Sequence, residues 1–262
     1  MHGSTVHGIQ SLDPARRGEP LGYYHRKGPI GDVFESLRTR IPEARVAVAG
    51  LGAGTLAAFG EPGQHWTFYE IDPTVVRMAR DPRWFTYLRD SRAHQRVVLG
   101  DARLSLARAA DERYDLLVLD AYSSDAIPVH LITREALHLY LERLTPDGML
   151  AFHVSNRYFD LTRVVARLAA DAGLVARIRV DAVSRADRDR GATSSRYVVM
   201  VRAPGDLGTL AQDPRWQPLQ ADATVALWTD DFASPLSVLK WDETLPIRSA
   251  MRVAAEGLRD QP

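Results

Sequence analysis

The sequence predicts an α/β fold built on a mostly parallel sheet that helices cover on both faces. Short, continuously apolar runs such as Leu116–Leu119 alternate with longer helical stretches, which is the pattern of buried parallel strands and their crossover helices. One apolar run, Val46–Ala49, leads into a glycine-rich turn at Gly50–Gly54, and the next run ends in an acid, Glu70. A strand, a glycine turn, a helix and an acid twenty residues after the first glycine are typical of a nucleotide-binding crevice.

From Arg45 onward the predicted elements follow a regular order. We expect parallel strands at residues 45–50, 66–71, 96–100, 114–120 and 148–154, with helices near 53–60, 73–80, 102–110, 131–144 and 159–172. Two further strands at 174–181 and 195–202, joined by a polar, arginine-rich connection, form the expected terminal antiparallel hairpin.

The two ends of the chain do not follow this alternation of strands and helices. At the start, the sequence predicts a β-hairpin from two short strands, Val6–Gln10 and Leu21–His25, and then a helix at Pro29–Arg40. The segment after residue 204 contains Pro and Trp without a clear period. We therefore expect a hairpin-and-helix lid at 1–44, a nucleoside-binding catalytic domain at 45–203 and a C-terminal extension at 204–262.

The composition excludes some classes of protein. Of the 262 residues, 33 are basic and 33 acidic, whereas a nucleic-acid-binding domain normally carries a basic excess. The sequence contains no cysteine, so disulfides and thiolate metal sites are excluded. No apolar run approaches the ~20 residues of a membrane span, and the first residues lack the basic and apolar regions of a signal peptide. We expect a cytoplasmic protein that neither inserts into a membrane nor binds nucleic acid.

The spacing of the glycines indicates the kind of nucleotide. A dinucleotide fingerprint needs a glycine three residues after its second one, where this chain has Thr55. The third glycine comes earlier instead, so Gly50, Gly52 and Gly54 fit an S-adenosyl ligand, which brings no pyrophosphate to the helix N-terminus. A tight turn without any ligand is the alternative.

Several acids stand at the predicted carboxyl ends of the strands, where open α/β sheets bind their ligands. Glu70 is placed to accept hydrogen bonds from ribose hydroxyls. Asp101 is placed to accept one from an adenine amino group, while the backbone N–H of Ala102 donates to the ring. A helix N-cap is an equally suitable role for Asp101.

Asp120 opens a loop that runs to Pro128 and carries two carboxylates, two hydroxyls and a phenol. A carboxylate at this point can hold a cationic amine or take its proton, whereas a capped loop before the next helix is the alternative. Tyr23, Tyr24 and Tyr122 are candidates for cation–π contact with a sulfonium, or else ordinary packing residues. The histidines show no metal-ligand spacing, so we expect no metal site.

With these motifs the chain resembles the spermidine synthase (polyamine aminopropyltransferase) superfamily, in particular its bacterial spermidine-synthase-like branch. The resemblance covers roughly residues 5–160 and lies mainly in the stretches Gly50–Thr55, Tyr69–Pro73, Gly100–Arg103 and Tyr114–Asp125. It implies a Rossmann-like fold of the S-adenosylmethionine-dependent transferases.

The resemblance also implies roles for single residues. It implies that Gln10 contacts the aminopropyl donor, that Glu70 holds the ribose and that Asp101 holds the adenine. Asp120 is the residue implied to accept the proton of the amine. The candidate substrate-binding residues are Tyr24, which by this resemblance lines the amine channel, Tyr122, Asp125 as an amine anchor, and His153.

Two departures from the family pattern concern the acceptor. Ala121 and Tyr122 are inserted in the family's Asp-Ser-Ser-Asp-Pro loop. After the fifth strand, His153, Asn156 and Arg157 stand where the family tends to carry an acid. Cationic and amide groups there disfavour a second ammonium, so we expect putrescine to be a poor substrate and a monoamine to be a better one.

The favoured function is aminopropyl transfer from decarboxylated S-adenosylmethionine to an amine, which releases methylthioadenosine. An S-adenosylmethionine-dependent methyltransferase and a non-catalytic nucleoside-binding module are the alternatives. The expected co-substrate is decarboxylated S-adenosylmethionine or S-adenosylmethionine, without a metal. The expected partners are a small-molecule amine and a second copy of the chain in a homodimer.

Overall fold

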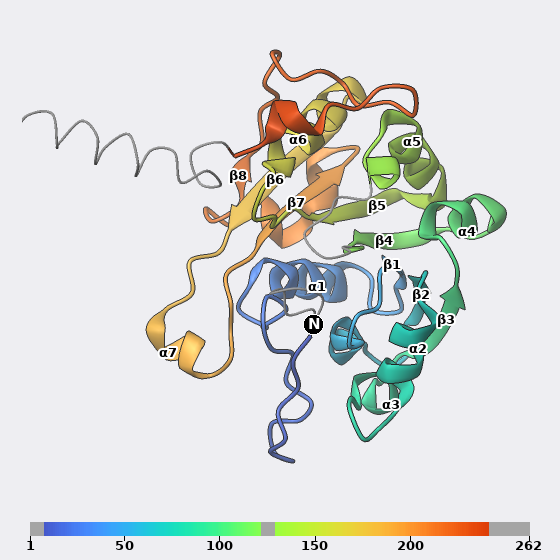
Figure 1. Ribbon diagram of the computed structural model, residues 1–262, viewed down its shortest axis with the longest axis vertical. Coiled ribbons are helices and arrows are strands. Elements are labelled where there is room, and N and C mark those ends of the chain that lie inside the picture. The colour runs from blue at the N-terminus through green and yellow to red at the C-terminus, as the bar shows by residue number, and fades with distance from the viewer. Residues whose placement is uncertain (1–7, 122–128, 241–262) are drawn as a thin grey trace, which may run out of the picture.

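An eight-stranded sheet forms the centre of the protein in the computed structural model, which describes residues 8–121 and 129–240 (Figure 1). Its order is β3-β2-β1-β4-β5-β7-β6-β8. β1 to β5 pair in parallel, whereas β7 is antiparallel to both β5 and β6. The strands are β1 (Arg45–Ala49), β2 (His65–Glu70), β3 (His94–Leu99), β4 (Tyr114–Leu119), β5 (Leu144–His153), β6 (Val175–Val180), β7 (Arg196–Val201) and β8 (Gln217–Pro218).

Helices cover both faces of this sheet, and Figure 1 shows α1 below it and α5 and α6 above it. Alternate residues of each strand face two cores: Val46 and Val48 pack into the first, Ala47 and Leu117 into the second. Burial on both faces explains why the strands are continuously apolar. The first core is covered by α1 (Pro29–Arg40), α2 (Pro73–Arg80) and α3 (Tyr87–Asp90), and the second by α4 (Ala102–Arg108), α5 (Arg134–Arg143) and α6 (Leu161–Asp171).

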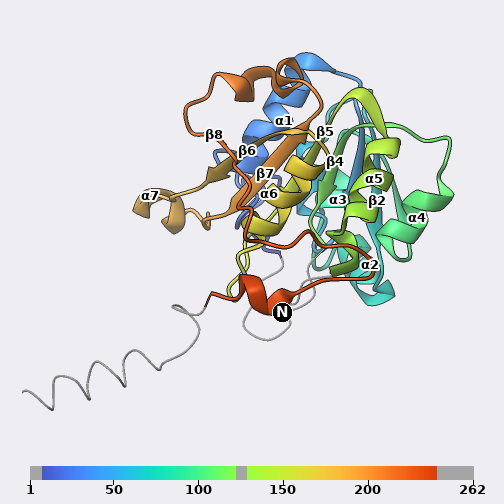
Figure 2. The ribbon, with the colours of Figure 1, turned by 90° about the horizontal axis from the view of Figure 1, so that it is seen from above.

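The predicted parallel sheet and its terminal antiparallel hairpin are confirmed. The predicted helix at 53–60 is instead a short 3-10 helix, η1 (Thr55–Phe59), because glycines with positive φ precede it and Gly60 ends it. The sequence did not predict α7 (Arg185–Asp189), which projects from the body in Figure 2. It also did not predict the short elements α3, η3 (Pro204–Ala211), β8 and η4 (Pro235–Val238).

The predicted N-terminal β-hairpin is wrong for the described residues, of which 8–28 form turns and no strand. The backbone of this segment pairs with a distant part of the chain instead. The N–H of Gly22 donates to the Gly191 carbonyl at 2.8 Å, and the Gly22 carbonyl accepts from the Thr193 N–H at 3.1 Å. The N-terminal segment is thereby fixed to the connection between β6 and β7. Part of the first predicted strand, Val6–His7, lies outside the described residues.

The chain before β1 and the chain after β7 both contribute to the cores of the sheet. Val33 and Leu37 of α1 are buried in the first core. Trp216 joins the first core and Trp228, which is fully buried, joins the second. Both predicted outer parts therefore contribute side chains to the cores of the sheet. Within those residues, none of the helices has the length and apolar character needed to cross a membrane.

Candidate functional site

A cavity of about 560 Å³ lies at the carboxyl ends of β1 to β4. Its volume is in the range of small-molecule sites. The glycine turn and the strand ends contribute backbone groups and polar side chains to its wall, from Tyr23, Tyr24, Gly50, Leu51, Gly52, Glu70, Asp72, Asp101, Ala102, Asp120 and His130.

The glycine turn after β1 brings bare backbone to the cavity. Gly50 has φ +100°, and a Cβ atom there would lie 2.4 Å from the backbone oxygen of Asp120. Gly50 and Gly52 line the cavity, as predicted. Gly54 does not, but its N–H donates to the Leu51 carbonyl at 2.9 Å and so closes the turn. Only glycine satisfies both the backbone conformation and the close approach at Gly50.

Glu70, at the end of β2, supports this turn. Its Oε2 accepts from the Leu51 N–H at 3.0 Å, and its Oε1 accepts from the Asp72 N–H at 2.9 Å. Each carboxylate oxygen has a further lone pair, so Glu70 can also accept hydrogen bonds from a ligand in the cavity. The side chain thus fixes the turn and presents a negative charge beside it.

Asp101 is the N-cap of α4, because its Oδ1 accepts from the Leu104 N–H at 2.8 Å. Its Oδ2 lies 2.8 Å from Nε2 of His130, a contact that sequence reasoning missed because 29 positions separate the two residues. Burial raises the pKa of Asp101, but the hydrogen bonds from Leu104 and His130 outweigh it and leave that pKa below its usual value. Asp101 therefore remains an acceptor at neutral pH, next to the cavity-lining Ala102.

Asp120 follows β4, and its side chain is only 4 % exposed. Its Oδ2 accepts from the Tyr24 hydroxyl at 2.5 Å, and its Oδ1 lies 2.7 Å from Nδ1 of His153. Nε2 of His153 lies 2.8 Å from the Ser155 hydroxyl, which accepts from the Arg196 N–H. We assign the tautomer from this network: Ser155 donates to Nε2, and Nδ1–H donates to Asp120. Two donors therefore hold the carboxylate in one orientation.

Two tyrosines form the wall next to Asp120. The rings of Tyr23 and Tyr24 have centroids 4.3 Å apart, and Tyr23 also lies 4.8 Å from the ring of His153. Burial first, and then the negative charge of Asp120, raise the pKa of both phenols well above its usual value. Both hydroxyls therefore stay protonated at neutral pH. Contact with a sulfonium stays a prediction for both rings.

Two other predicted site residues, Gln10 and His153, lie away from the cavity wall. The Gln10 side chain donates to the Thr86 hydroxyl at 2.9 Å and accepts from the Thr86 N–H at 2.8 Å, so it ties the N-terminal segment to the start of α3. His153 lies behind Asp120 and does not line the cavity. Tyr122 and Asp125 lie outside the described residues. The roles implied for these four residues stay predictions.

Asn156 and Arg157, on which the expectation about putrescine also depends, do not line the cavity either. The Asn156 amide oxygen accepts from the N–H groups of Tyr158 and Phe159, and the Arg157 guanidinium lies over the Tyr158 ring at 5.6 Å. They are part of the loop after β5. In the structure these residues therefore give no reason for a second ammonium to be rejected.

The apolar part of the cavity wall was not predicted. It comes from the turn after β2, from α2 and from the segments before α3 and α5, so no local pattern marks it. Its members are Ile71, Val75, Met78, Phe85 and Leu131.

The fold and this cavity define a class of protein, the S-adenosylmethionine-dependent transferase fold. The chain superposes on human methyltransferase-like protein 13, solved in complex with SAH, with a TM-score of 0.53 and 20% identity, over 77% of this chain and 96% of that one. It superposes on precorrin-6y C5,15-methyltransferase from Geobacter metallireducens with a TM-score of 0.52 and 12% identity, over 75% and 94%. At these identities the likeness concerns the fold alone, and it confirms the predicted fold class.

Within this class, the chain is similar to the polyamine aminopropyltransferase of Vibrio vulnificus. The two are 36% identical over 122 residues, which are 44% of this chain and 40% of the relative. The predicted resemblance to the spermidine synthase superfamily is thereby confirmed for that stretch. The matched stretch is less than half of the relative's length. A scan against models of protein families finds no match for the chain.

Proposed function

We propose that this chain is a spermidine-synthase-like transferase. It moves an aminopropyl group from decarboxylated S-adenosylmethionine to an amine and releases methylthioadenosine. The observation that carries the proposal is the composition of one cavity, in which Glu70 and Asp101 stand on one side of the glycine turn and Asp120 with Tyr24 on the other. The similarity to a polyamine aminopropyltransferase supports it.

The order of the strands supports a division of the cavity into a nucleoside side and an acceptor side, one on each side of β1. Glu70 and Asp101 follow β2 and β3, so the adenosine of the donor binds there, with its ribose on Glu70 and its base near Asp101. Asp120 follows β4, the neighbour of β1 on the other side. The sulfonium and the amine meet on this second side, beside the rings of Tyr23 and Tyr24.

The reaction is a single displacement in which the chain moves one proton. The amine arrives as an ammonium, since a lysine-like pKa is ~10.4. Asp120 accepts one proton from it, directly or through water. The freed lone pair forms a C–N bond to the carbon next to sulfur, the C–S bond breaks with its electron pair on sulfur, and neutral methylthioadenosine leaves. Tyr24 and His153 keep the accepting carboxylate oriented, so little reorganisation is needed.

Methyl transfer from S-adenosylmethionine is the second candidate, because the fold is shared with the two methyltransferases above. The two reactions differ in whether the site accepts the carboxylate of the donor. His153, Asn156 and Arg157 carry cationic or amide groups that would suit a carboxylate, but none of them lines the cavity. That observation favours aminopropyl transfer.

A donor and acceptor panel tests the proposal. The purified protein is titrated by calorimetry with S-adenosylmethionine, its decarboxylated form and methylthioadenosine, and it is incubated with each donor and a set of amines for product analysis by mass spectrometry. We expect tighter binding of the decarboxylated donor and a product heavier than the amine by one aminopropyl group. A methylated product instead shows that the chain is a methyltransferase, and nucleoside binding without any product shows a non-catalytic module.

Replacement of Glu70 separates its support of the turn from its contact with a ribose. We expect Glu70→Ala to weaken methylthioadenosine binding by roughly 2 kcal/mol or more, about 30-fold, because a hydrogen bond to a charged group is worth ~1.5–3 kcal/mol. Adenine, which has no ribose, should lose less than about threefold in affinity, or ~0.6 kcal/mol. Calorimetry with both ligands checks this, with a thermal scan to show that the variant is folded. Equal losses for both ligands would mean that Glu70 only supports the turn.

A further inference from the structure

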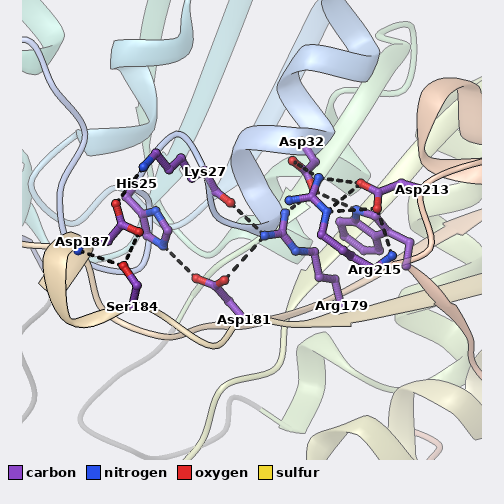
Figure 3. Close-up of polar contacts among 10 residues, drawn as sticks. His25, Lys27, Asp32, Arg179, Asp181, Ser184, Asp187, Asp213 and Arg215 are labelled. Atoms are coloured by element: carbon purple, nitrogen blue, oxygen red, sulfur yellow. Dashed lines mark hydrogen bonds and ion pairs between the residues drawn. The ribbon is translucent and has the colours of Figure 1, made fainter.

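A cluster of polar contacts joins β6 to α1 and to His25 and Lys27, which follow the two cavity tyrosines in the chain (Figure 3). Its centre is Arg179 of β6, whose side chain is 6 % exposed. The guanidinium donates to the carbonyl of Lys27 at 2.8 Å and to the carboxylate of Asp32, and it lies 3.5 Å from Asp181. Asp181 in turn lies 2.8 Å from Nε2 of His25. We call these five residues the Arg179 cluster.

The two carboxylates of the Arg179 cluster, those of Asp32 and Asp181, both lie beside the Arg179 guanidinium. Asp32, in the first turn of α1, also accepts from Arg215 and from the indole N–H of Trp216, both at 3.1 Å. The planar guanidinium of Arg179 reaches oxygens on Lys27, Asp32 and Asp181 at the same time. A lysine in its place keeps the charge but has no such fork, so it cannot hold these segments together.

Two neighbouring residues link the Arg179 cluster to the cavity. His25 points to Asp181, whereas its neighbour Tyr24 points to Asp120. A shift of residues 25–27 therefore moves the Tyr24 hydroxyl relative to the carboxylate that it orients. The strength of a hydrogen bond falls steeply with donor–acceptor distance and angle, so such a shift weakens the hydrogen bond from Tyr24 to Asp120.

We propose that Arg179 is a positioning residue for the acceptor side of the cavity, which it sets by fixing residues 23–27. This inference rests on the proposed transferase function. Arg179 makes its contacts with the N-terminal segment, α1 and Asp181, whereas the residues on the nucleoside side belong to the ends of β1, β2 and β3. Its replacement should therefore affect use of the amine and leave nucleoside binding in place.

The test compares Arg179→Lys with a matched control, Arg143→Lys. Arg143 has a side chain that is 9 % exposed and donates to the carbonyls of Leu106 and Ala110, on the other face of the sheet. We expect Arg179→Lys to lower kcat/KM for the best amine of the panel about tenfold or more, because small displacements of reacting groups are costly, while the methylthioadenosine affinity stays within about twofold. Arg143→Lys should leave kcat/KM for the amine and the methylthioadenosine affinity within about twofold of the values for the unmodified protein. Equal losses of amine use and nucleoside binding in Arg179→Lys, or the same kinetic loss in Arg143→Lys, overturn the proposal.

A second readout does not depend on turnover. Amide hydrogen exchange of residues 21–28 should become faster in Arg179→Lys and in Asp181→Asn, and should stay unchanged in Arg143→Lys. If the unmodified protein transfers no group from any donor, the proposed function fails, and this exchange measurement then decides whether Arg179 fixes the segment. Unchanged exchange in Arg179→Lys refutes the positioning role in either case.

Discussion

Asp120→Asn should abolish most of the turnover and spare nucleoside binding. Loss of a general base typically costs ~10²-fold or more in rate, and we expect at least that for kcat with the best amine. The affinity for methylthioadenosine should stay within about threefold, or ~0.6 kcal/mol, because the proposed nucleoside contacts lie on the other side of β1. An asparagine retains the shape of Asp120 and can still exchange hydrogen bonds with Tyr24 and His153. Steady-state kinetics and calorimetry on the same preparation separate the two effects.

Asp115→Asn is the matched control for this variant. Asp115 lies near the opposite end of the same strand, where it accepts from the Arg45 N–H and the Thr145 hydroxyl. Its replacement should leave turnover nearly unchanged. Near-normal turnover of Asp120→Asn would show that another group takes the proton, and a parallel loss in both variants would show that the effect is one of folding.

Gly50→Ala should destabilise the whole protein and distort the site. The backbone at Gly50 has φ +100°, and the added methyl group would lie 2.4 Å from the backbone oxygen of Asp120. Backbone strain of this kind costs ~1–3 kcal/mol and overpacking a further ~1–3 kcal/mol, so we expect the free energy of unfolding to fall by about 2–6 kcal/mol. Urea unfolding measures this loss.

The control for that strain is Gly173→Ala. Gly173 also has a positive φ, of +65°, but a Cβ atom there would meet nothing within 4 Å. We expect Gly173→Ala to lower the free energy of unfolding by ~1–2 kcal/mol, which is the cost of the left-handed backbone conformation for alanine. If both alanine variants lose the same free energy, the close approach between Gly50 and Asp120 is not a constraint on the fold.

The sheet could be predicted from sequence because its signals are local. The central strands β1 and β4 are buried on both faces and appear as continuous apolar runs, and Gly50 and Gly54 mark the turn that follows the first. The N-terminal segment could not be predicted in the same way. Its backbone partners, Gly191 and Thr193, follow far along the chain, and no local pattern identifies them. An apparent pair of short strands was therefore misread as a hairpin.

The same distinction holds for the candidate site. Residues at strand ends, such as Glu70, Asp101 and Asp120, were identified because parallel strands end at one edge. What each of them contacts depends on tertiary packing. The contact of His130 with Asp101 and that of His153 with Asp120 join residues 29 and 33 positions apart and therefore leave no spacing signal.

The attachment of the N-terminal segment to β6 and to the connection before β7 has a consequence for the order of folding. Residues 45–120, which build the nucleoside side, can begin to assemble as they leave the ribosome. The hydrogen bond from Arg179 to Lys27 spans 152 positions. The N-terminal segment can therefore dock only after most of the chain has been synthesised. Closing so long a loop is also slow, because the chain loses conformational entropy on closure before the distant contacts add stability. We therefore expect a newly made chain to be able to recognise a nucleoside before its acceptor wall is complete.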